Sequence, residues 1–527
     1  MTNLQTKLFA GLLAATVLTV PALAETVLRI DEVAVGELDP AKASDYADSI
    51  LMFNVYDTLV LPTQGAPGHS PHLAKSWSVD GANYTFELRD DVKFQSGNVM
   101  SADDVVFSLR RMQALGAGHS HLFNGVVAEA IDATTVQFKL EKPYAPFVAS
   151  LVRLPILDKK LVVANLGEGD GEMGDWGQAY LSGHGAGTGA YVVKTHNPQE
   201  ETVMAKSDNY FLGVSDAAPD EARLRYSLEA ATVRALIAKG EHDISSQWLP
   251  PEVMGSLAMG GAQLLTESGT GAFYVKMNTT RAPLDDVNCR LALSNAFNYE
   301  IALKMVAITD DVSSGAPATG AIPVGMFGSR DQSVVQVRDL DAAREYLAAC
   351  RYDPAEFNLE ITWIAEVPLE ERLALLMASN FAEIGIKSTI TKVPWALFTE
   401  KVAKPENSPN ISQIFVNAVT GDPDTLLYGM YHSSLSGTWQ SPEHLNDAEV
   451  DAALDAGRTA SDDAGREAAY SALNDRLMAI APTIYGFDRQ SVFAAGHRVK
   501  VPALSDPSKA FGLDGLGFSF RLMEMSE

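Results

Sequence analysis

The sequence is poor in cysteine and in basic residues, and each shortage excludes a class of protein. Cys289 and Cys350 are the only cysteines among 527 residues. Two thiols are too few for a Cys-based zinc finger, an iron–sulfur cluster or a disulfide-dense scaffold. Lysine and arginine number 40 against 67 acidic residues, which gives a net charge of −27. A surface this acidic repels phosphate backbones and anionic lipid heads, which argues against nucleic-acid binding and peripheral membrane docking.

Catalytic signatures are missing as well. The chain contains no G-x-S-x-G, H-E-x-x-H or G-x-x-x-x-G-K-[ST] motif, and Gly183–Gly189 resembles a phosphate-binding loop only in its glycines. We therefore expect no cofactor and no enzymatic activity. Two alternatives stay open: the close pairs His69/His72 and His119/His121 are spaced for a metal site, and paired carboxylates would suit a secreted hydrolase.

No apolar run is long enough to cross a bilayer, but the N-terminus has the layout of a secretory signal peptide. Lys7 precedes the uncharged stretch Leu8–Val20, and Ala22-Leu23-Ala24 forms an A-x-A cleavage site. We expect cleavage before Glu25 and export to the bacterial periplasm, without a lipid anchor because no cysteine follows the apolar run. In that oxidising compartment the two cysteines either form a disulfide or remain two buried thiols.

Hydrophobic periodicity predicts a mixed α/β chain. Residues 84–88 and 136–140 alternate apolar and polar side chains as half-buried strands do, and residues 103–115 form an amphipathic helix capped by Ser101 or Asp103. Nine glycines between Gly167 and Gly189 indicate a flexible internal boundary. Further on, the pattern predicts helices over 290–306, 340–349, 369–384 and 448–481, a strand over 359–363, and short strands after Ile484.

Several short motifs then appear in a fixed order along the chain. The longest is Pro71-His72-Leu73-Ala74-Lys75-Ser76-Trp77, continued by Tyr84–Arg89, Val92-Lys93-Phe94 and Ser101–Ser108. The others are Leu38-Asp39-Pro40, Asn54–Val60, Gly187–Tyr191, Met277-Asn278-Thr279 with Pro283-Leu284, Arg290–Ala296, Ile384–Lys387, and Gly421-Asp422-Pro423-Asp424. Together they resemble the bacterial extracellular solute-binding family that serves dipeptide, oligopeptide and nickel ABC importers.

This resemblance implies a fold and a role. The fold would be α/β, of the periplasmic binding protein type II kind, with two lobes and an extra inserted domain. Domain I would comprise residues 25–61, 186–268 and 488–527, domain II residues 62–185, and domain III residues 269–487. The protein would be a monomeric receptor that captures a peptide or peptide-like molecule by hinge closure and delivers it to membrane permease subunits. A sugar, an opine, another metabolite or a metal complex is the alternative ligand.

The resemblance also implies where the ligand binds. The positions that match ligand-contacting positions of the family fall in four clusters: Ser44, Asp45 and Tyr46; Gln247 and Trp248; Trp395; and Val419, Asp422, Tyr431 and Trp439. In peptide-binding relatives, an aspartate that pairs with the α-ammonium group of the peptide stands where this chain has Val419. A buried ammonium without a carboxylate is costly. Either Asp45 or Asp422 replaces that aspartate, or the ligand has no such ammonium.

Overall fold

The computed structural model describes residues 26–32, 35, 38–226 and 228–526. The expected signal peptide and its cleavage site before Glu25 lie outside these residues. Within them, no helix is both long enough and apolar enough to span a membrane.

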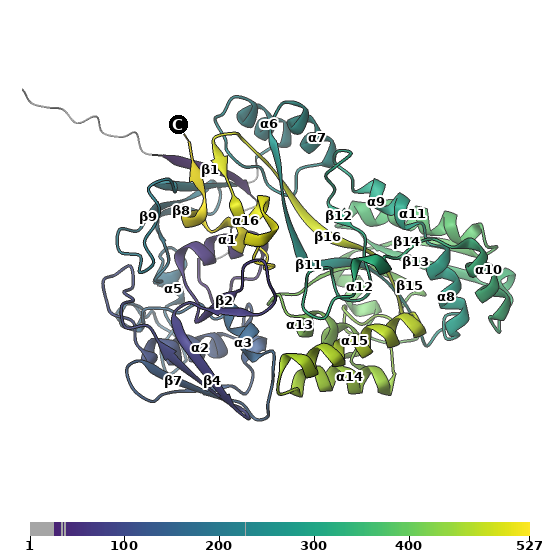
Figure 1. The fold of residues 1–527 in the computed structure, drawn as a ribbon, viewed down its shortest axis with the longest axis horizontal. Helices are drawn as coiled ribbons and strands as arrows, with labels where there is room; N and C mark the ends of the chain where they lie inside the picture. Colours follow the sequence, from purple (N-terminus) through teal and green to yellow (C-terminus); the bar gives the residue numbers. More distant parts are fainter. Residues whose placement is uncertain (1–25, 33–34, 36–37, 227, 527) are drawn as a thin grey trace, which may run out of the picture.

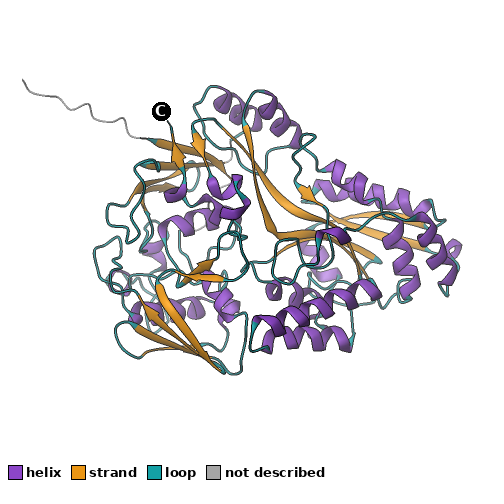
Figure 2. Cartoon of the chain, viewed as in Figure 1, coloured by secondary structure: helices purple, strands orange, loops and turns teal. Residues whose placement is uncertain are grey.

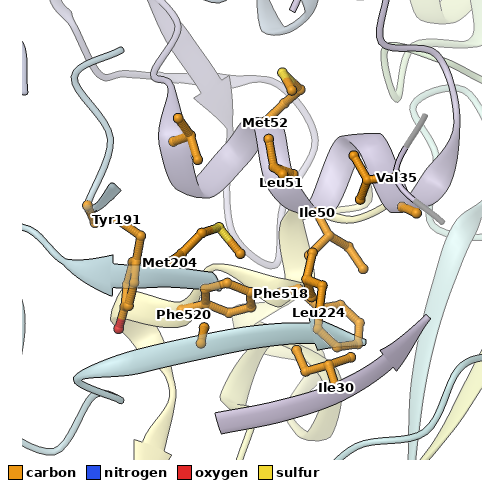
Figure 3. Packing of buried hydrophobic residues seen from close by; sticks show 14 of the residues in the cluster. Ile30, Val35, Ile50, Leu51, Met52, Tyr191, Met204, Leu224, Phe518 and Phe520 are labelled. Carbon is orange, nitrogen blue, oxygen red and sulfur yellow. The ribbon is translucent and has the colours of Figure 1, made fainter. Parts of the chain in front are cut away.

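A four-stranded sheet organises one end of the molecule, which we call lobe 1. Its strand order is β1-β10-β9-β8, that is Val27–Glu32, Glu221–Tyr226, Glu201–Lys206 and Tyr191–Asn197, with β1 and β10 parallel. Helix α1 (Tyr46–Val55) packs on this sheet. The C-terminal segment returns to the same core, where Phe518 and Phe520 lie among Tyr191, Met204 and Leu224 (Figure 3).

A second four-stranded sheet, β4-β5-β7-β6, forms the part of lobe 1 that the sequence analysis expects as an inserted domain. Its strands are Ala74–Asp80, Asn83–Leu88, Thr135–Lys139 and Val127–Ala130. Helix α2 (Ala102–Leu115) covers it, and Ser101 is its N-cap, with the Ser101 backbone N–H donating to Asp104 at 2.8 Å. The two strands and the helix predicted here are confirmed.

Lobe 2 contains a six-stranded sheet with helices on both faces (Figure 2). The strand order is β12-β16-β11-β15-β13-β14, that is Gly315–Ala316, Thr483–Ala495, Gln263–Met277, Ile411–Asn417, Asn358–Ile364 and Lys387–Val393. Helices α8 (Val287–Ala296) and α11 (Pro368–Ala382) pack on one face. Helices α13 (Pro423–Tyr431), α14 (Ala448–Thr459) and α15 (Asp463–Ile480) pack on the other.

The long antiparallel strands β11 and β16 connect the two lobes (Figure 1). Residues 263–268 of β11 pair with 490–495 of β16, next to the lobe 1 sheet. Residues 272–276 pair with 483–488, inside the lobe 2 sheet. The register shifts between these two stretches, between Ser268 and Ala272. A shift of register interrupts the ladder locally and bends the strand at this point.

The remaining elements connect or cover these sheets. They are β2 (Val60–Pro62), β3 (His69–Pro71), α3 (Phe147–Ser150), α4 (Lys159–Val163), α5 (Gln178–Leu181), α6 (Ala230–Ala238), α7 (Pro251–Met259), α9 (Tyr299–Met305), α10 (Leu340–Ala349), α12 (Trp395–Lys401), α16 (Pro502–Ser505), β17 (Val499–Lys500) and β18 (Glu524–Met525). Single 3-10 turns lie between them, including Leu151–Arg153.

Two helix predictions in lobe 2 are wrong in detail. The helix expected over 290–306 is two helices, because the Asn298 side chain accepts from the Ile301 backbone N–H and starts α9. The helix expected over 448–481 is also interrupted, since Asp462 accepts from Gly465 and starts α15. The tail after Ile484 first continues the long strand β16, and the expected short strands follow as β17 and β18.

The glycine-rich stretch has a defined structural role instead of a flexible one. The Asp175 carboxylate closes its first half by accepting from the backbones of Gly167 and Gly177 at 2.7 Å. In its second half, a Cβ on Gly187 would lie 2.1 Å from the Val55 carbonyl oxygen. Glycine is therefore needed for close approach to the end of α1, which explains the superficial likeness to a phosphate-binding loop.

Two questions left open by the sequence are answered by side-chain placement. Cys289 on α8 and Cys350 at the end of α10 form a disulfide. His72 Nε2 and Asp57 Oδ1 form a hydrogen bond of 2.7 Å inside lobe 1. Among the described residues, neither His69/His72 nor His119/His121 belongs to a cluster with metal-site geometry.

Candidate functional site

The parallel strands of lobe 2 end together on one edge of the sheet. Strand β13 is parallel to both β14 and β15, so the residues after Ile364, Val393 and Asn417 leave the sheet on the same side. The Trp395 backbone N–H donates to Glu366 Oε2 at 3.1 Å, which ties the ends of β13 and β14 together. In open α/β sheets, ligands bind outside the carboxyl ends of parallel strands. This edge is therefore the lobe 2 half of the candidate site.

Two tryptophans from separate segments meet at this edge. Trp395, the first residue of α12, has a ring centroid 5.3 Å from that of Trp439, at a near-perpendicular angle. The ring of Trp395 also stacks on Phe398, which is fully buried, and 39 % of the Trp395 surface stays exposed. The anchored side of the ring is thus fixed while the other side is available for contact. The sequence placed both tryptophans at the ligand, and the structure brings them together.

Val419, just after β15, lies where lobe 2 touches lobe 1. Its carbonyl oxygen accepts from Arg153 Nε at 2.5 Å. Arg153 also donates to Ser49 Oγ on α1 at 3.0 Å. This arginine of lobe 1 therefore contacts both helix α1 of its own lobe and the Val419 loop of lobe 2. Burial lowers the pKa of Arg153 to about 10, which leaves it cationic at neutral pH. The backbone carbonyl of Val419 is therefore next to a positive charge.

Asp422 and Tyr431, which the sequence analysis places at the ligand, both have partners inside lobe 2. Asp422 is the N-cap of α13 and accepts from Arg466 with both oxygens at 2.9 Å. Tyr431 is 1 % exposed, donates to Thr483 Oγ1 at 3.1 Å and lies under Lys276 Nζ. Both side chains are committed to contacts inside lobe 2. A ligand contact by either residue stays a prediction, and the Asp422 carboxylate is already paired with Arg466.

Of the predicted cluster Ser44, Asp45 and Tyr46, the first two residues are on the surface of lobe 1 and the third points into it. Ser44 and Asp45 are exposed at the start of α1, where the Asp48 carboxylate accepts from both backbones. The Tyr46 hydroxyl points inward and donates to Glu267 Oε2 at 2.5 Å. Burial, followed by the charge of Asp514, raises the pKa of Glu267 to about 7. Tyr46 is thus tied to strand β11, close to where that strand crosses between the lobes.

Gln247 and Trp248 occupy the corresponding edge of lobe 1. Ile244 bridges Ile30 of β1 in parallel fashion, so Gln247 and Trp248 follow the carboxyl end of a strand segment, as the Trp395 loop does in lobe 2. Trp248 is 58 % exposed. Arg489 of β16 donates to Gln247 Oε1 at 3.2 Å, and its guanidinium lies 5.4 Å from the Trp248 ring centroid.

Further direct contacts join the two lobes. The Tyr144 hydroxyl of lobe 1 donates to Asp424 Oδ2 at 2.6 Å, and the Ala145 N–H donates to the Arg458 carbonyl at 2.7 Å. Asn417 donates to Asp514 at 3.0 Å. Sequence reasoning missed these residues, together with Arg153, Glu267 and Arg489. No local pattern marks them, because each acts through a partner far away in the chain.

Comparisons with known proteins agree with this architecture. A family model described as "Bacterial extracellular solute-binding proteins, family 5 Middle" matches residues 69–438. Heme-binding protein A of Haemophilus influenzae is 27 % identical over 436 residues, covering 76 % of this chain and 75 % of that protein. The probable D,D-dipeptide-binding periplasmic protein DdpA of Escherichia coli is 24 % identical over 475 residues, covering 88 % of each.

A solved structure shows the same fold. HbpA2 of Haemophilus parasuis superposes with a TM-score of 0.81 at 23 % identity, covering 95 % of this chain and all of that one. The expected bilobal fold with an extra domain is confirmed, and so is the expected role of a solute-binding receptor. The match to the family model covers more than half of the sequence. This chain belongs to the bacterial extracellular solute-binding proteins, family 5.

Proposed function

We propose that this protein is the periplasmic receptor of an ABC importer, and that it captures a peptide or peptide-like molecule between its lobes. The observation that carries the proposal is the set of exposed aromatic side chains at the strand ends of both lobes, Trp248 on lobe 1 and Trp395 next to Trp439 on lobe 2. Aromatic faces supply large contact area at low conformational cost. The protein acts as a monomer that binds and releases its ligand unchanged, and its partners are the membrane permease subunits.

The connection between the lobes supports closure on a ligand. Strands β11 and β16 cross between the lobes and shift register at Ser268/Ala272. We place the hinge there, which keeps the domain boundaries as residues 25–61, 186–268 and 488–527 for domain I, 62–185 for domain II and 269–487 for domain III. Hinges of this kind absorb closure in a few residues at element ends.

The aromatic edge is tested by Trp395→Ala. Truncation removes contact area and stacking of order 1–3 kcal/mol, so affinity for peptides retained from a tripeptide library is expected to fall about tenfold or more. Leu397→Ala is the matched control, because Leu397 is exposed on the same helix and points elsewhere than the Trp395–Trp439 pair. Calorimetry gives the affinities, and the melting temperature of the ligand-free variants reports the fold. Unchanged affinity in the Trp395 variant would remove this residue from the site.

The ligand is expected to lack a free α-ammonium group near Val419. Arg153 donates to the Val419 carbonyl, so an ammonium there would meet a cation while losing its hydration, and Val419 itself offers no carboxylate. N-acetyl-Ala-Ala should bind more tightly than Ala-Ala, by about tenfold on the cost of burying an unpaired charge. Val419→Asp should reduce this preference. Tighter binding of the free dipeptide to the unchanged protein would show that another acid provides the anchor, and Asp45 would be mutated first.

We further propose that the mature protein begins at Glu25. The motivation is the apolar run Leu8–Val20 followed by Ala22-Leu23-Ala24. Intact-mass spectrometry of protein recovered from the periplasm should give the mass of residues 25–527. A retained N-terminus or an acyl adduct would contradict the assignment.

A further inference from the structure

We propose that Arg489, Gln247 and Trp248 form a subsite for a carboxylate group of the ligand. This inference rests on the proposed function, because it assigns a chemical group to one end of the solute. It adds Arg489, a residue that neither the sequence motifs nor the aromatic edges indicate. The three residues come from two segments that meet where β16 leaves lobe 2 for lobe 1.

Arg489 has a charge that the protein does not neutralise locally. Among the residues that the structure describes, its guanidinium contacts the Gln247 amide oxygen and the Trp248 ring, and no carboxylate pairs with it. The preceding residue, Asp488, is held elsewhere, since its Oδ2 accepts from the Val324 backbone at 2.7 Å. Arg458 and Arg466, by contrast, are both paired with aspartates. A half-buried arginine with free donors is suited to bind a planar carboxylate.

Gln247 contributes a second donor that is already oriented. Its Oε1 accepts from Arg489, which fixes the amide so that Nε2 points away from the guanidinium. That Nε2 is enclosed by protein and has no hydrogen-bond partner among the described residues. A buried amide donor without an acceptor is costly, and a ligand oxygen would satisfy it. The guanidinium therefore has free donors for an acceptor beside Arg489, and the Gln247 amide has one unpaired donor on its other side.

Trp248 completes the subsite with an apolar face. Its ring is largely exposed, although the Pro250-Pro251 start of α7 follows directly and restrains the chain. The ring holds the guanidinium by a cation–π contact at 5.4 Å. It also offers a flat surface beside the carboxylate position. The net charge of −27 does not prevent anion binding here, because charges more than about 10 Å away are screened at physiological salt.

The test uses small probes that differ only in the acidic group. Saturation-transfer NMR with N-acetylglycine and with N-acetylglycinamide measures binding to the full mature chain. The unchanged protein should bind the acid at least about fivefold more tightly than the amide, because only the acid offers a charged acceptor. Arg489→Gln should abolish that preference. Gln247→Glu should abolish it too, since the new carboxylate would occupy Arg489. Equal binding of acid and amide, or a preference that survives both substitutions, would overturn the proposal.

Failure of this subsite is distinguishable from failure of the proposed function. If peptide binding depends on Trp395 while Arg489→Gln leaves N-acetylglycine binding unchanged, the receptor assignment is supported and the carboxylate subsite is wrong. If no peptide binds but N-acetylglycine binding depends on Arg489, the subsite stands and the peptide assignment falls. Ligand-free melting temperatures identify any variant with a damaged fold. Should Arg489→Gln fail to fold, Gln247→Glu alone decides the result.

Discussion

Replacing Arg111 by methionine is expected to lower the free energy of unfolding by about 3–5 kcal/mol, the usual cost of leaving one partner of a buried ion pair alone. Arg111 lies on α2, and its two terminal nitrogens donate to the two carboxylate oxygens of Asp39 at 2.6 Å each. The side chains are 0 % and 1 % exposed. The variant leaves the buried Asp39 carboxylate without the cation that pairs with it.

The neighbouring residue provides a matched control for this variant. Arg110 forms an ion pair with Glu172 at 3.3 Å, but these side chains are 58 % and 76 % exposed. Arg110→Met should therefore cost less than about 0.5 kcal/mol. Adding Asp39→Leu to Arg111→Met should recover part of the loss, because the buried charge is then gone. Urea denaturation measures all three, and equal destabilisation by the Arg110 and Arg111 variants would contradict burial as the cause.

The same pair shows what a sequence motif does and does not reveal. Leu38-Asp39-Pro40 was one of the segments that resembled the family, and its position along the chain sufficed for that purpose. Its physical role needs Arg111, 72 residues away, and α2 packed beside the loop. Periodicity predicted α2 and strands β5 and β7 because helix and strand patterns are local. A partner across such a distance has no local pattern.

Helix ends were less predictable than helix existence. Residues 290–306 and 448–481 keep a helical period throughout, so the sequence predicted continuous helices. Asn298 and Asp462 interrupt them by accepting backbone N–H groups of the following turn. Side chains of this type favour N-caps over helix interiors, and this was the signal available in the sequence.

The candidate site was partly predictable for a related reason. The resemblance indicates where the segments that carry Trp395 and Trp439 lie in the fold. The two rings are in contact in the structure. The resemblance also places Tyr431 near the ligand, but position in the family fold does not tell which face of a helix a residue occupies. Tyr431 lies on the buried face of α13. Arg153 was missed because its contact with Val419 arises only where the lobes meet, and Arg489 because its partner Gln247 is 242 residues away in the chain.

Removing the disulfide is expected to lower the unfolding free energy by about 4 kcal/mol, from the chain-entropy cost of opening a loop of this length. Cys289 and Cys350 are 61 residues apart and join α8 to α10, so the bond closes a large loop in lobe 2. A Cys289→Ala, Cys350→Ala double variant should unfold at lower urea concentration than the oxidised protein. Adding dithiothreitol should bring the unchanged protein to a similar midpoint and leave the double variant unaffected. This internal control separates the bond from the side-chain replacements, because the reductant changes no packing in a chain without cysteine. If the unchanged protein keeps its midpoint after mass spectrometry shows full reduction, the loop gains no stability from the bond, and α8 and α10 are held together by their packing alone.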